Sequence, residues 1–548
     1  MSCRIHGGDF DQGGQATRRL KEKLVRLGVS GTVLRRAMIA AYEAEMNVVI
    51  HARTGTLWAR LGDGKLELEV ADEGPGIPDV QLALREGWST ASEKARQLGF
   101  GAGLGLPNIR RNSDRFEIET RVGRGTRVRS TILLDEAAGA QTGAGAGKPA
   151  PAAGPRPDYT VEPAPGISAE RCNRCLRCIF SCPTGALRVH DHGPLLRPGL
   201  CVGCTECAAS CPRAVFSIRD GERLRWQLPA EGQEAVVVLP RALLMSPLAG
   251  RSPRAALGGL ARLGFREVRF TEEWEDAVQR EARLQEGRPG AAVPVIAPVC
   301  PAVTALVESR FPSLIPNLAP TASPLEAAGE EFPLRPVVLV AACAAQVVSA
   351  GTASLTDRLT VITTADLFEA LHADTPAASA APGPTVLCAP REMPLAPAPD
   401  ELRASGPRDV LRALSAAEAG ALDGVRILTP RLCAHGCSGS PYVTPDSFLS
   451  TLAGPRLLPL LSGARESDAG AVPRSTPYRQ RTGMRLGPDM ASAIQALGRI
   501  DELLATLPGR DCGACGAPAC ALYAEDVVMG RSGSSSCPHA SLTREVSP

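Results

Sequence analysis

The chain has 548 residues, enough for about three to four domains. Its 60 basic and 58 acidic residues nearly balance, so the sequence offers no basic field for nucleic acid or an anionic membrane surface. The longest apolar run, Val337 to Ala350, is too short to span a bilayer, and the first residues lack the apolar core of a signal peptide. We therefore expect a soluble, cytoplasmic protein.

Cysteine usage is the strongest compositional signal. The chain has 18 cysteines, most of them in tight clusters, and only 7 histidines. In a reducing cytosol such clusters bind metal rather than form disulfides. Ligation by thiolates alone favours iron–sulfur clusters over mixed Cys/His zinc sites.

Two segments of linker composition divide the chain. Residues 137–160, rich in Ala, Gly and Pro, cannot bury enough apolar surface to order themselves, and residues 465–489 form a second, weaker break. We predict domains at residues 1–136, 161–221, 222–464 and 490–548. The expected fold class is multidomain α/β and α+β: an α/β sandwich, a cysteine-rich insert, an α/β domain with parallel strands, and a small helical module.

The first domain combines a helix with two glycine loops. The pattern over Arg35–Ala52 predicts a helix that carries Glu43 and Asn47 one turn apart on one side. An alternating strand then runs into the glycine loop Asp72–Pro78. A second glycine run, at residues 98–105, precedes another helix, and a closing strand contains Thr126. Glycines ahead of a helix let backbone N–H groups approach phosphate oxygens.

In this order the segments resemble the GHKL ATPase superfamily, most closely its switch-type serine kinases and anti-sigma factors, over about residues 10–134. The resemblance implies that Asn47 ligates Mg²⁺, that Asp72 binds the adenine amino group and that Thr126 supports the adenine end. It implies that Glu43 is the base that activates a water or an acceptor hydroxyl, although Glu45 is close enough in sequence to compete. The glycines implied at the nucleotide are Gly74, Gly76, Gly101, Gly103 and Gly105. A plain α/β sandwich, and a domain that binds ATP without turning it over, remain open as alternatives.

The second domain carries a doubled cysteine motif. Residues 172–183 read C-x-x-C-x-x-C-x-x-x-C-P, and residues 201–212 repeat it. This resembles the bacterial-type two-cluster ferredoxins, in which the fourth cysteine of each motif crosses to the other cluster. The resemblance assigns one [4Fe–4S] cluster to Cys172, Cys175, Cys178 and Cys211, and the other to Cys201, Cys204, Cys207 and Cys182. Zinc or structural disulfides are poor alternatives, because the doubled pattern has few other uses.

The third domain alternates strand-like and helical runs, which predicts an α/β fold with largely parallel strands. Cysteines follow directly after three of the strands: Cys300, Cys343, and then Cys433 with Cys437. Because α/β folds place ligands at the carboxyl ends of strands, these four thiols could form one cluster site. Four packing cysteines in an apolar core are the alternative.

Two stretches of this domain, "APVCPAVTALVESRFPSLIPNLAPTASPLEAAG" and "CAHGCSGSP", resemble the C-terminal catalytic domain of [FeFe]-hydrogenases and its non-catalytic relatives. The resemblance implies a [4Fe–4S] cluster on the four cysteines. Catalytic members carry a proton-donating Cys where this chain has Val299, and a Lys that anchors the diiron unit where it has Gln346; Ala341 and Ala342 replace their Met-Pro. We therefore expect a retained cluster and no hydrogen chemistry.

The last domain places a helix before a third kind of cysteine motif. The predicted apolar face of the helix comprises Met490, Ile494, Leu497, Ile500, Leu504 and Leu507. The pattern that follows resembles the small iron–sulfur module of membrane-bound ferredoxin oxidoreductases and corrinoid proteins. It implies a further [4Fe–4S] cluster on Cys512, Cys515, Cys520 and Cys537, with zinc as the runner-up. Cys3 and Cys388 are left over.

Two functions fit these parts. The first is an iron–sulfur redox-sensing regulator linked to hydrogenase or ferredoxin metabolism, whose anti-sigma or serine-kinase-like domain acts on a protein partner, such as a switch protein. The second is an electron-transfer subunit of a hydrogenase or oxidoreductase complex with an ATP-gated domain. The linker after residue 136 favours the first, because a tethered domain can swing to a partner. The expected cofactors are four [4Fe–4S] clusters, ATP and Mg²⁺; whether ATP is hydrolysed, transferred or only bound stays open.

Overall fold

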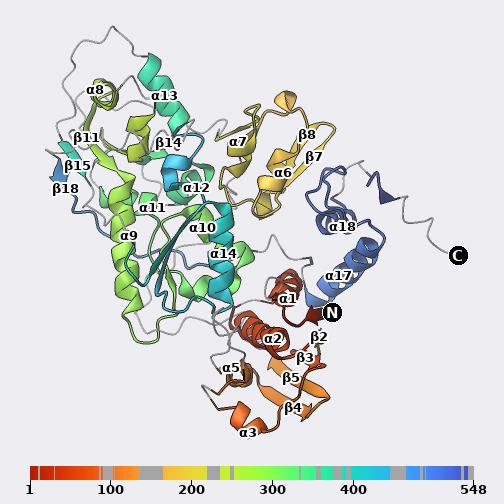
Figure 1. Ribbon diagram of the computed structural model, residues 1–548. Helices are drawn as coiled ribbons and strands as arrows, with labels where there is room; N and C mark the ends of the chain where they lie inside the picture. Colours follow the sequence, from red (N-terminus) through yellow and green to blue (C-terminus); the bar gives the residue numbers. More distant parts are fainter. Residues whose placement is uncertain are drawn as a thin grey trace.

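The computed structural model describes residues 1–9, 13–29, 31–85, 88–90, 103, 105–134, 165–218, 235–246, 252–332, 335–352, 359–373, 386–389, 397–444, 464–481, 486–487, 489–531 and 536–540. Figure 1 shows four units in contact: the N-terminal unit in red and orange, a small yellow unit, a large green and cyan unit, and a blue C-terminal module. Within the described part of the chain, no helix is long and apolar enough to cross a membrane. The predicted linker at 137–160 lies outside the described residues.

The N-terminal unit is a two-layer α/β sandwich. Its antiparallel sheet has the order β1 (Ser2–His6), β2 (Thr54–Gly62), β3 (Lys65–Asp72), β5 (Gly125–Leu133), β4 (Arg115–Arg121). One face buries alternate residues such as Leu66, Leu68 and Val70 against the helices. Its helices are α1 (Gln15–Arg26), α2 (Gly31–His51), α3 (Val80–Ala83) and α5 (Gly105–Arg111). The predicted first helix, alternating strand and closing strand are confirmed, because their periodicity matched the face they bury.

The small unit repeats one local design twice. Each cysteine motif enters a short helix after a residue in left-handed conformation, Leu176 before α6 (Arg177–Ser181) and Thr205 before α7 (Glu206–Ser210). The helices meet where Ser181 Oγ lies 2.9 Å from Ser210 Oγ. Two small antiparallel pairs complete the unit: β6 (Gly166–Ile167) with β9 (Phe216–Ser217), and β7 (Leu187–His190) with β8 (Gly193–Leu196). Short 3₁₀ turns, η2 (Ala169–Arg171) and η3 (Pro198–Leu200), precede the two motifs.

The large unit has parallel strands, as predicted, but they divide between two sheets. The larger sheet has the order β14 (Leu359–Thr363), β13 (Val337–Ala341), β10 (Ala235–Leu239), β11 (Phe265–Phe270), β15 (Val386–Ala389), β18 (Arg465–Glu466). The smaller has the order β12 (Val295–Ile296), β17 (Ile427–Arg431), β16 (Glu401–Ser405). The strands that precede the four cysteines therefore come from both sheets.

The helices of the large unit pack around these sheets (Figure 1). The α-helices are α8 (Pro253–Arg262), α9 (Thr271–Glu286), α10 (Pro301–Arg310), α11 (Pro324–Glu331), α12 (Ala344–Thr352), α13 (Thr364–Ala373) and α14 (Pro407–Glu418). The 3₁₀ helices are η4 (Arg241–Met245), η5 (Pro312–Asn317) and η6 (Gly436–Gly439). The central strand β10 is wholly buried, which agrees with its unbroken apolar sequence.

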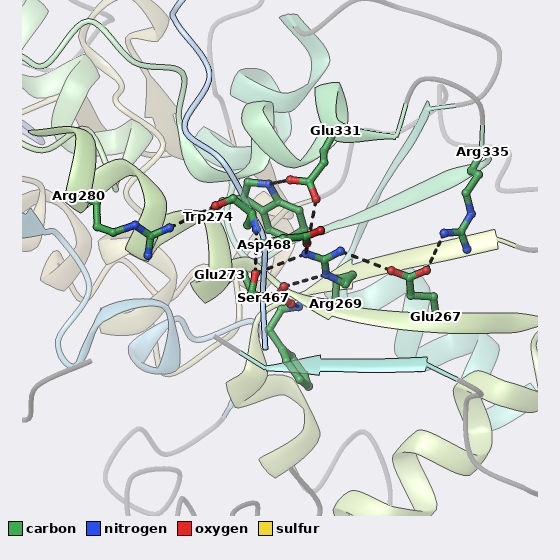
Figure 2. Close-up of polar contacts among 11 residues, drawn as sticks. Glu267, Arg269, Glu273, Trp274, Arg280, Glu331, Arg335, Ser467 and Asp468 are labelled. Carbon is green, nitrogen blue, oxygen red and sulfur yellow. Dashed lines mark hydrogen bonds and ion pairs between the residues drawn. The ribbon is translucent and has the colours of Figure 1, made fainter. Parts of the chain in front are cut away.

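The segment predicted as the second linker is instead packed on the large unit. Arg465–Glu466 form the edge strand β18, and the next residues, Ser467 and Asp468, contact the guanidinium of Arg269 (Figure 2). Arg269 is 4% exposed and also pairs with Glu273, Nε to Oε2 at 2.8 Å. A buried guanidinium needs counter-charges and acceptors for its five N–H groups. The polar residues that looked like a linker supply some of these acceptors.

The C-terminal module consists of α17 (Met490–Ala505) and α18 (Cys520–Val528). The predicted helix is confirmed, but its buried stripe is shifted. Ala493, Ala496, Leu497 and Ile500 are buried, whereas Ile494 is 42% exposed. The small alanines face the core because α18 and the end of α1 approach α17 closely there.

The N-terminal unit is docked on the large unit through a buried ion pair. Lys21 of α1 pairs with Glu418 at the end of α14, and its ammonium lies 3.8 Å from the ring centroid of Phe311. Burial lowers the pKa of Lys21, and Glu418 opposes that shift. Glu418 also accepts a hydrogen bond from Ser313 of η5, against which α2 packs.

Removing one charge of this pair should weaken the docking. In Glu418→Gln the Lys21 ammonium stays buried without a counter-charge, which we expect to cost about 3–5 kcal/mol. The double variant Lys21→Met/Glu418→Gln should recover most of that loss. Hydrogen exchange of the α1 amides in the full chain measures both effects. Protection in Glu418→Gln equal to wild type would contradict a buried pair.

Candidate functional site

The predicted nucleotide residues of α2 face the start of α5. The Nδ2 of Asn108 donates to Glu43 Oε1 at 2.7 Å. A Cβ on Gly105 would lie 3.0 Å from Asn47 Oδ1 and 3.4 Å from Glu43 Oε2, so a side chain there would crowd both groups. Burial raises the pKa of Glu43, and the bond from Asn108 opposes the shift. A carboxyl whose pKa is raised toward neutrality is suited to general-base work.

Glu45 has a different task. It is 2% exposed, and it accepts hydrogen bonds from the backbone N–H of Ala16 at 3.0 Å and of Thr17 at 2.8 Å. The Thr17 hydroxyl donates a third bond at 2.6 Å. These bonds occupy the carboxylate at the positive end of α1, where a negative charge is stabilising. The geometry therefore favours Glu43 over Glu45 as the residue beside the glycine loop.

Asp72 ends strand β3 and is held in place by backbone donors. Its Oδ1 accepts from Gly74 N at 2.7 Å and from Thr126 N at 3.3 Å, and burial raises the pKa of its carboxyl. The hydroxyls of Thr126 and Thr120 lie 3.0 Å apart. Gly76 has φ +72°, and a Cβ there would meet the carbonyl of Arg121 at 2.4 Å, so this turn requires glycine.

The second glycine loop is described only in part. Gly103 has φ +74°, Gly105 begins α5, and Gly101 lies outside the described residues. The described residues thus bring Glu43, Asn47 and Gly105 together, and separately Asp72 with Thr126. Their roles at a nucleotide stay predictions.

Twelve of the cysteines line three cavities. The first cavity is lined by Cys172, Cys175, Cys178 and Cys211. The second is lined by Cys182, Cys201, Cys204 and Cys207. The third is lined by Cys300, Cys343, Cys433 and Cys437. Each cavity joins a set grouped in the sequence analysis, including the crossing of Cys182 and Cys211 between the two motifs.

Each set of four thiols lines its own cavity. Among the described residues, no three His, Cys, Asp or Glu side chains lie close enough together to hold a single metal ion. Backbone donors point at the sulfurs, for example Ala186 N to Cys182 Sγ at 3.3 Å. Burial raises the pKa of Cys178 to about 11 and of Cys343 to about 12, so a bound cation would be needed to hold them as thiolates.

The third cavity contains the two replacements noted in the sequence. The apolar side chain of Val299 lies on its wall and carries no exchangeable proton. Gln346 accepts from Ala342 N at 2.6 Å through Oε1, and its Nε2 donates to Cys437 Sγ at 3.6 Å. Gln346 thus holds one of the four thiols.

Sequence reasoning missed an ion pair beside this cavity. Arg431 Nη2 lies 2.7 Å from Glu275 Oε2, and both side chains line the cavity. Arg431 stands just before the last cysteine motif, so its position could have been noticed. Glu275 lies on α9, far from any cysteine in the sequence, and no pattern identified it.

The second and third cavities are neighbours. Cys204 lines both of them, and the Thr205 hydroxyl lies 3.9 Å from Cys433 Sγ. Ala344 and Tyr442 of the large unit also line the second cavity. The small unit is therefore seated directly on the cysteine site of the large one.

The C-terminal cysteines lie in a more open loop. Cys512 is exposed, while Cys515, Cys520 and Cys537 are half-buried. Burial raises the pKa of Cys515, and nearby Cys537 and Cys512 raise it further. The backbone N–H of Cys537 donates to the Tyr523 hydroxyl at 3.2 Å, which ties the last cysteine to α18.

Four known families match consecutive parts of the chain. Residues 32–136 match the histidine kinase-, DNA gyrase B- and HSP90-like ATPases, and residues 165–188 match the 4Fe-4S binding domain. Residues 237–379 match the C-terminal domain of the iron-only hydrogenase large subunit, and residues 507–539 match an Fe-S cluster family. These matches confirm the four resemblances read from the motifs.

Curated relatives cover the N-terminal region. An anti-sigma F factor from Caldanaerobacter subterraneus subsp. tengcongensis is 37% identical over 100 residues, which are 17% of this chain and 66% of that protein. The serine/threonine-protein kinase RsbT from Bacillus subtilis is 29% identical over 124 residues, 22% of this chain and 87% of that protein. Among solved structures, two variants of [FeFe]-hydrogenase HydA1 from Chlamydomonas reinhardtii are 17% and 18% identical, with TM-scores of 0.32 and 0.31. They cover 47% and 49% of this chain and 90% of each hydrogenase chain.

Substitution of the two glutamates of α2, Glu43 and Glu45, should have different effects. Glu43→Gln should lower the rate of ATP turnover by about 10²–10⁴-fold. Nucleotide affinity should be retained, because the substitution removes the base but few contacts with the nucleotide. Glu45→Gln should keep the turnover rate and increase hydrogen exchange at the start of α1. Steady-state kinetics and exchange mass spectrometry distinguish them. If Glu45→Gln alone abolished turnover, the assignment of the base would be wrong.

Iron content tests the cysteine sets. Anaerobically reconstituted protein should hold about sixteen iron atoms, four per cubane. Cys300→Ser/Cys433→Ser should hold about four fewer, because the third cavity loses two ligands. Colorimetric iron analysis gives both numbers. Eight or fewer in the wild type would mean that only the doubled motif binds clusters.

Proposed function

We propose that this protein is a redox-sensing regulator in which iron–sulfur clusters govern an ATP-binding domain of the anti-sigma or serine-kinase type. The ATP-binding domain acts on a protein partner, either by holding it or by phosphorylating it. The observation that carries the proposal is the buried contact of α1 with the cluster-bearing units, above all Lys21 with Glu418. The names of the N-terminal relatives, an anti-sigma factor and a serine/threonine-protein kinase, support an output directed at protein.

In the proposed sensor, the N-terminal unit acts through direct contact with the large unit rather than as a freely moving domain. The linker composition favoured an output domain that moves freely to its partner. In the structure α2 packs against η5 and α14, and Lys21 of α1 pairs with Glu418 of α14. A structural change in the large unit would therefore act directly on α2, the helix that carries Glu43 and Asn47. The signal would not require the N-terminal domain to diffuse on a tether.

The cavities supply a route for the signal. Clusters held by the doubled motif would exchange electrons with an external ferredoxin-type donor. The second cavity shares Cys204 with the wall of the third, so an electron needs one short step to reach the large unit. In the third cavity Val299 offers no proton and Gln346 binds Cys437, which supports storage of an electron there rather than hydrogen chemistry.

The chain's own residues suit nucleotide binding. Asp72, fixed by Gly74 N and Thr126 N, would accept a hydrogen bond from the adenine amino group. Asn47 would hold Mg²⁺, which supplies neutralisation of phosphate charge when bound. Glu43, with its raised pKa, would take the proton of an attacking hydroxyl or water. The glycines at 103 and 105 leave room for phosphates.

The second candidate function is an electron-transfer subunit of a hydrogenase or oxidoreductase complex with an ATP-gated domain. The adjacency of the second and third cavities favours it, since such a path also serves electron transfer. The two functions differ in direction: in the sensor, clusters control ATP chemistry, whereas in the subunit, ATP controls the rate of electron flow.

The decisive experiment compares nucleotide binding and ATP turnover in oxidised and dithionite-reduced protein, with a co-purified partner present. We expect a change of about 5–150-fold, the usual range of coupling between two sites. Asn47→Ala should bind no Mg-nucleotide and keep its full iron content, which controls for loss of clusters. Superimposable curves for the two redox states would rule out the sensor.

A further inference from the structure

The C-terminal module lies between the ATP-binding unit and the small cysteine-rich unit (Figure 1). Two consecutive acidic residues of α18 face these two neighbours. Glu525, 6% exposed, forms an ion pair with Arg26 in the last turn of α1, and its Oε1 lies 3.6 Å from Arg531 Nη1. Asp526, 4% exposed, pairs with Arg188 and lies 3.6 Å from Arg197, both in the small unit. One turn of α18 thus binds both units at once.

Apolar packing joins the module to the same end of α1. Leu27, which caps α1, is buried in one cluster with Leu497, Ile500 and Ala524 of the module. The backbone N–H of Leu486 donates to the carbonyl of Arg26 at 3.1 Å. The last turn of α1 is therefore part of the core of the C-terminal module.

The cysteine loop of the module is fitted to the small unit. Gly513 has φ +72°, and a Cβ there would lie 2.9 Å from the ring of Phe180. Gly516 has φ +86°, and a Cβ there would lie 2.2 Å from the carbonyl of Val189. Val189 N in turn donates to Gly516 O at 2.9 Å. The loop that carries Cys512 and Cys515 thus lies against the unit that carries the first cavity.

We propose that the C-terminal module transmits the state of its iron–sulfur site to the ATP-binding domain, and that Glu525 with Arg26 is the transmitting contact. This inference rests on the proposed sensor function and names the path it takes. Helix α18 begins at Cys520, and Tyr523 accepts the hydrogen bond from Cys537 N. Because two of the four candidate ligands are tied to α18, a change at the site shifts the helix that carries Glu525.

Helix α1 continues the path to the nucleotide residues. Its last turn is held by the module, and its first turn is held by Glu45 of α2 through Ala16 and Thr17. Glu45 lies two residues from Glu43 and from Asn47 along α2. A shift of α1 along its axis therefore acts on the helix that carries both predicted nucleotide residues. Asp526 keeps α18 anchored to the small unit, so the motion is directed at α1.

A second cross-domain pair offers a matched control. Lys23, one turn before Arg26, pairs with Asp501 of α17 at 2.5 Å, but these side chains are 29% and 47% exposed. The side chains of Arg26 and Glu525 are only 15% and 8% exposed. An exposed pair contributes little, whereas loss of one partner from a buried pair is costly. Without Arg26, the buried Glu525 keeps the more distant Arg531, at 3.6 Å, but loses its contact with α1. Arg26→Gln and Lys23→Gln each remove one positive charge from α1. The first charge belongs to a buried ion pair and the second to an exposed one, so Lys23→Gln is the control.

The test measures the affinity of the reconstituted full chain for a non-hydrolysable ATP analogue by calorimetry, oxidised and dithionite-reduced. We expect the two affinities to differ by at least about 5-fold in the wild type and in Lys23→Gln. They should agree to within about 2-fold in Arg26→Gln, with unchanged iron content. Hydrogen exchange of the α1 amides should respond to reduction in the wild type and not in Arg26→Gln.

The possible outcomes separate the two proposals. A wild-type redox effect that persists in Arg26→Gln overturns the transmitting contact and leaves the sensor function standing. No redox effect in the wild type overturns both. If Arg26→Gln binds less iron than the wild type, the test is repeated with Glu525→Gln. That substitution removes the other charge of the pair and leaves the sequence of α1 unchanged. A redox effect retained in Glu525→Gln equally overturns the inference.

Discussion

The arrangement of this protein depends on helix α1 and the three buried carboxylates that bind it, each on a different element. Glu45 of α2 accepts hydrogen bonds from the first turn of α1. Glu418 of α14 forms an ion pair with Lys21, and Glu525 of α18 forms one with Arg26. Each carboxylate comes from a different domain, and each contact is largely withdrawn from water. Charges in such positions are costly to separate, so the three domains hold one relative placement through a single twelve-residue helix.

This placement gives the cysteine sites an order. The third cavity shares a wall with the second, and the loop of the C-terminal module packs on the unit that bears the first. The ATP-binding unit contacts both ends of this series, the large unit through Lys21 and the module through Arg26. A chain built this way can let a change at either end reach the same helix.

The large unit keeps a cysteine site while losing polar groups that hydrogen chemistry would use. Val299 fills a wall position with a side chain that cannot move a proton, and Gln346 uses both ends of its amide, on Ala342 and Cys437. The ion pair of Glu275 with Arg431 keeps a balanced pair of charges beside the same cavity. In the proposed sensor, these features support a site that holds charge rather than one that turns over a substrate.

Local patterns in the sequence determined much of this protein. Helical and strand periodicity identified α2, β3, β10, β13 and α17, because each buries a face that its own residues specify. Cysteine spacing identified the eight thiols of the doubled motif, and the resemblance to two-cluster ferredoxins divided them between two sites. The four thiols of the third cavity were grouped by their positions after strands and by the resemblance to [FeFe]-hydrogenases. Gly76 was implied by the resemblance to GHKL ATPases, and the structure adds the physical reason that its turn tolerates no Cβ.

Contacts between distant segments were decided by the tertiary structure alone. The choice of Glu43 over Glu45 depends on which side of α2 meets α1, and adjacent positions in a sequence do not show this. Residues 465–489 have the composition of a linker, yet two of their polar side chains, Ser467 and Asp468, contact the buried Arg269, whose need for acceptors is invisible locally. The docking of α1 rests on Lys21 with Glu418 and Arg26 with Glu525, pairs separated by hundreds of residues. Sequence periodicity reports which face of an element is buried, whereas the partner of a buried charge is set by the folded chain.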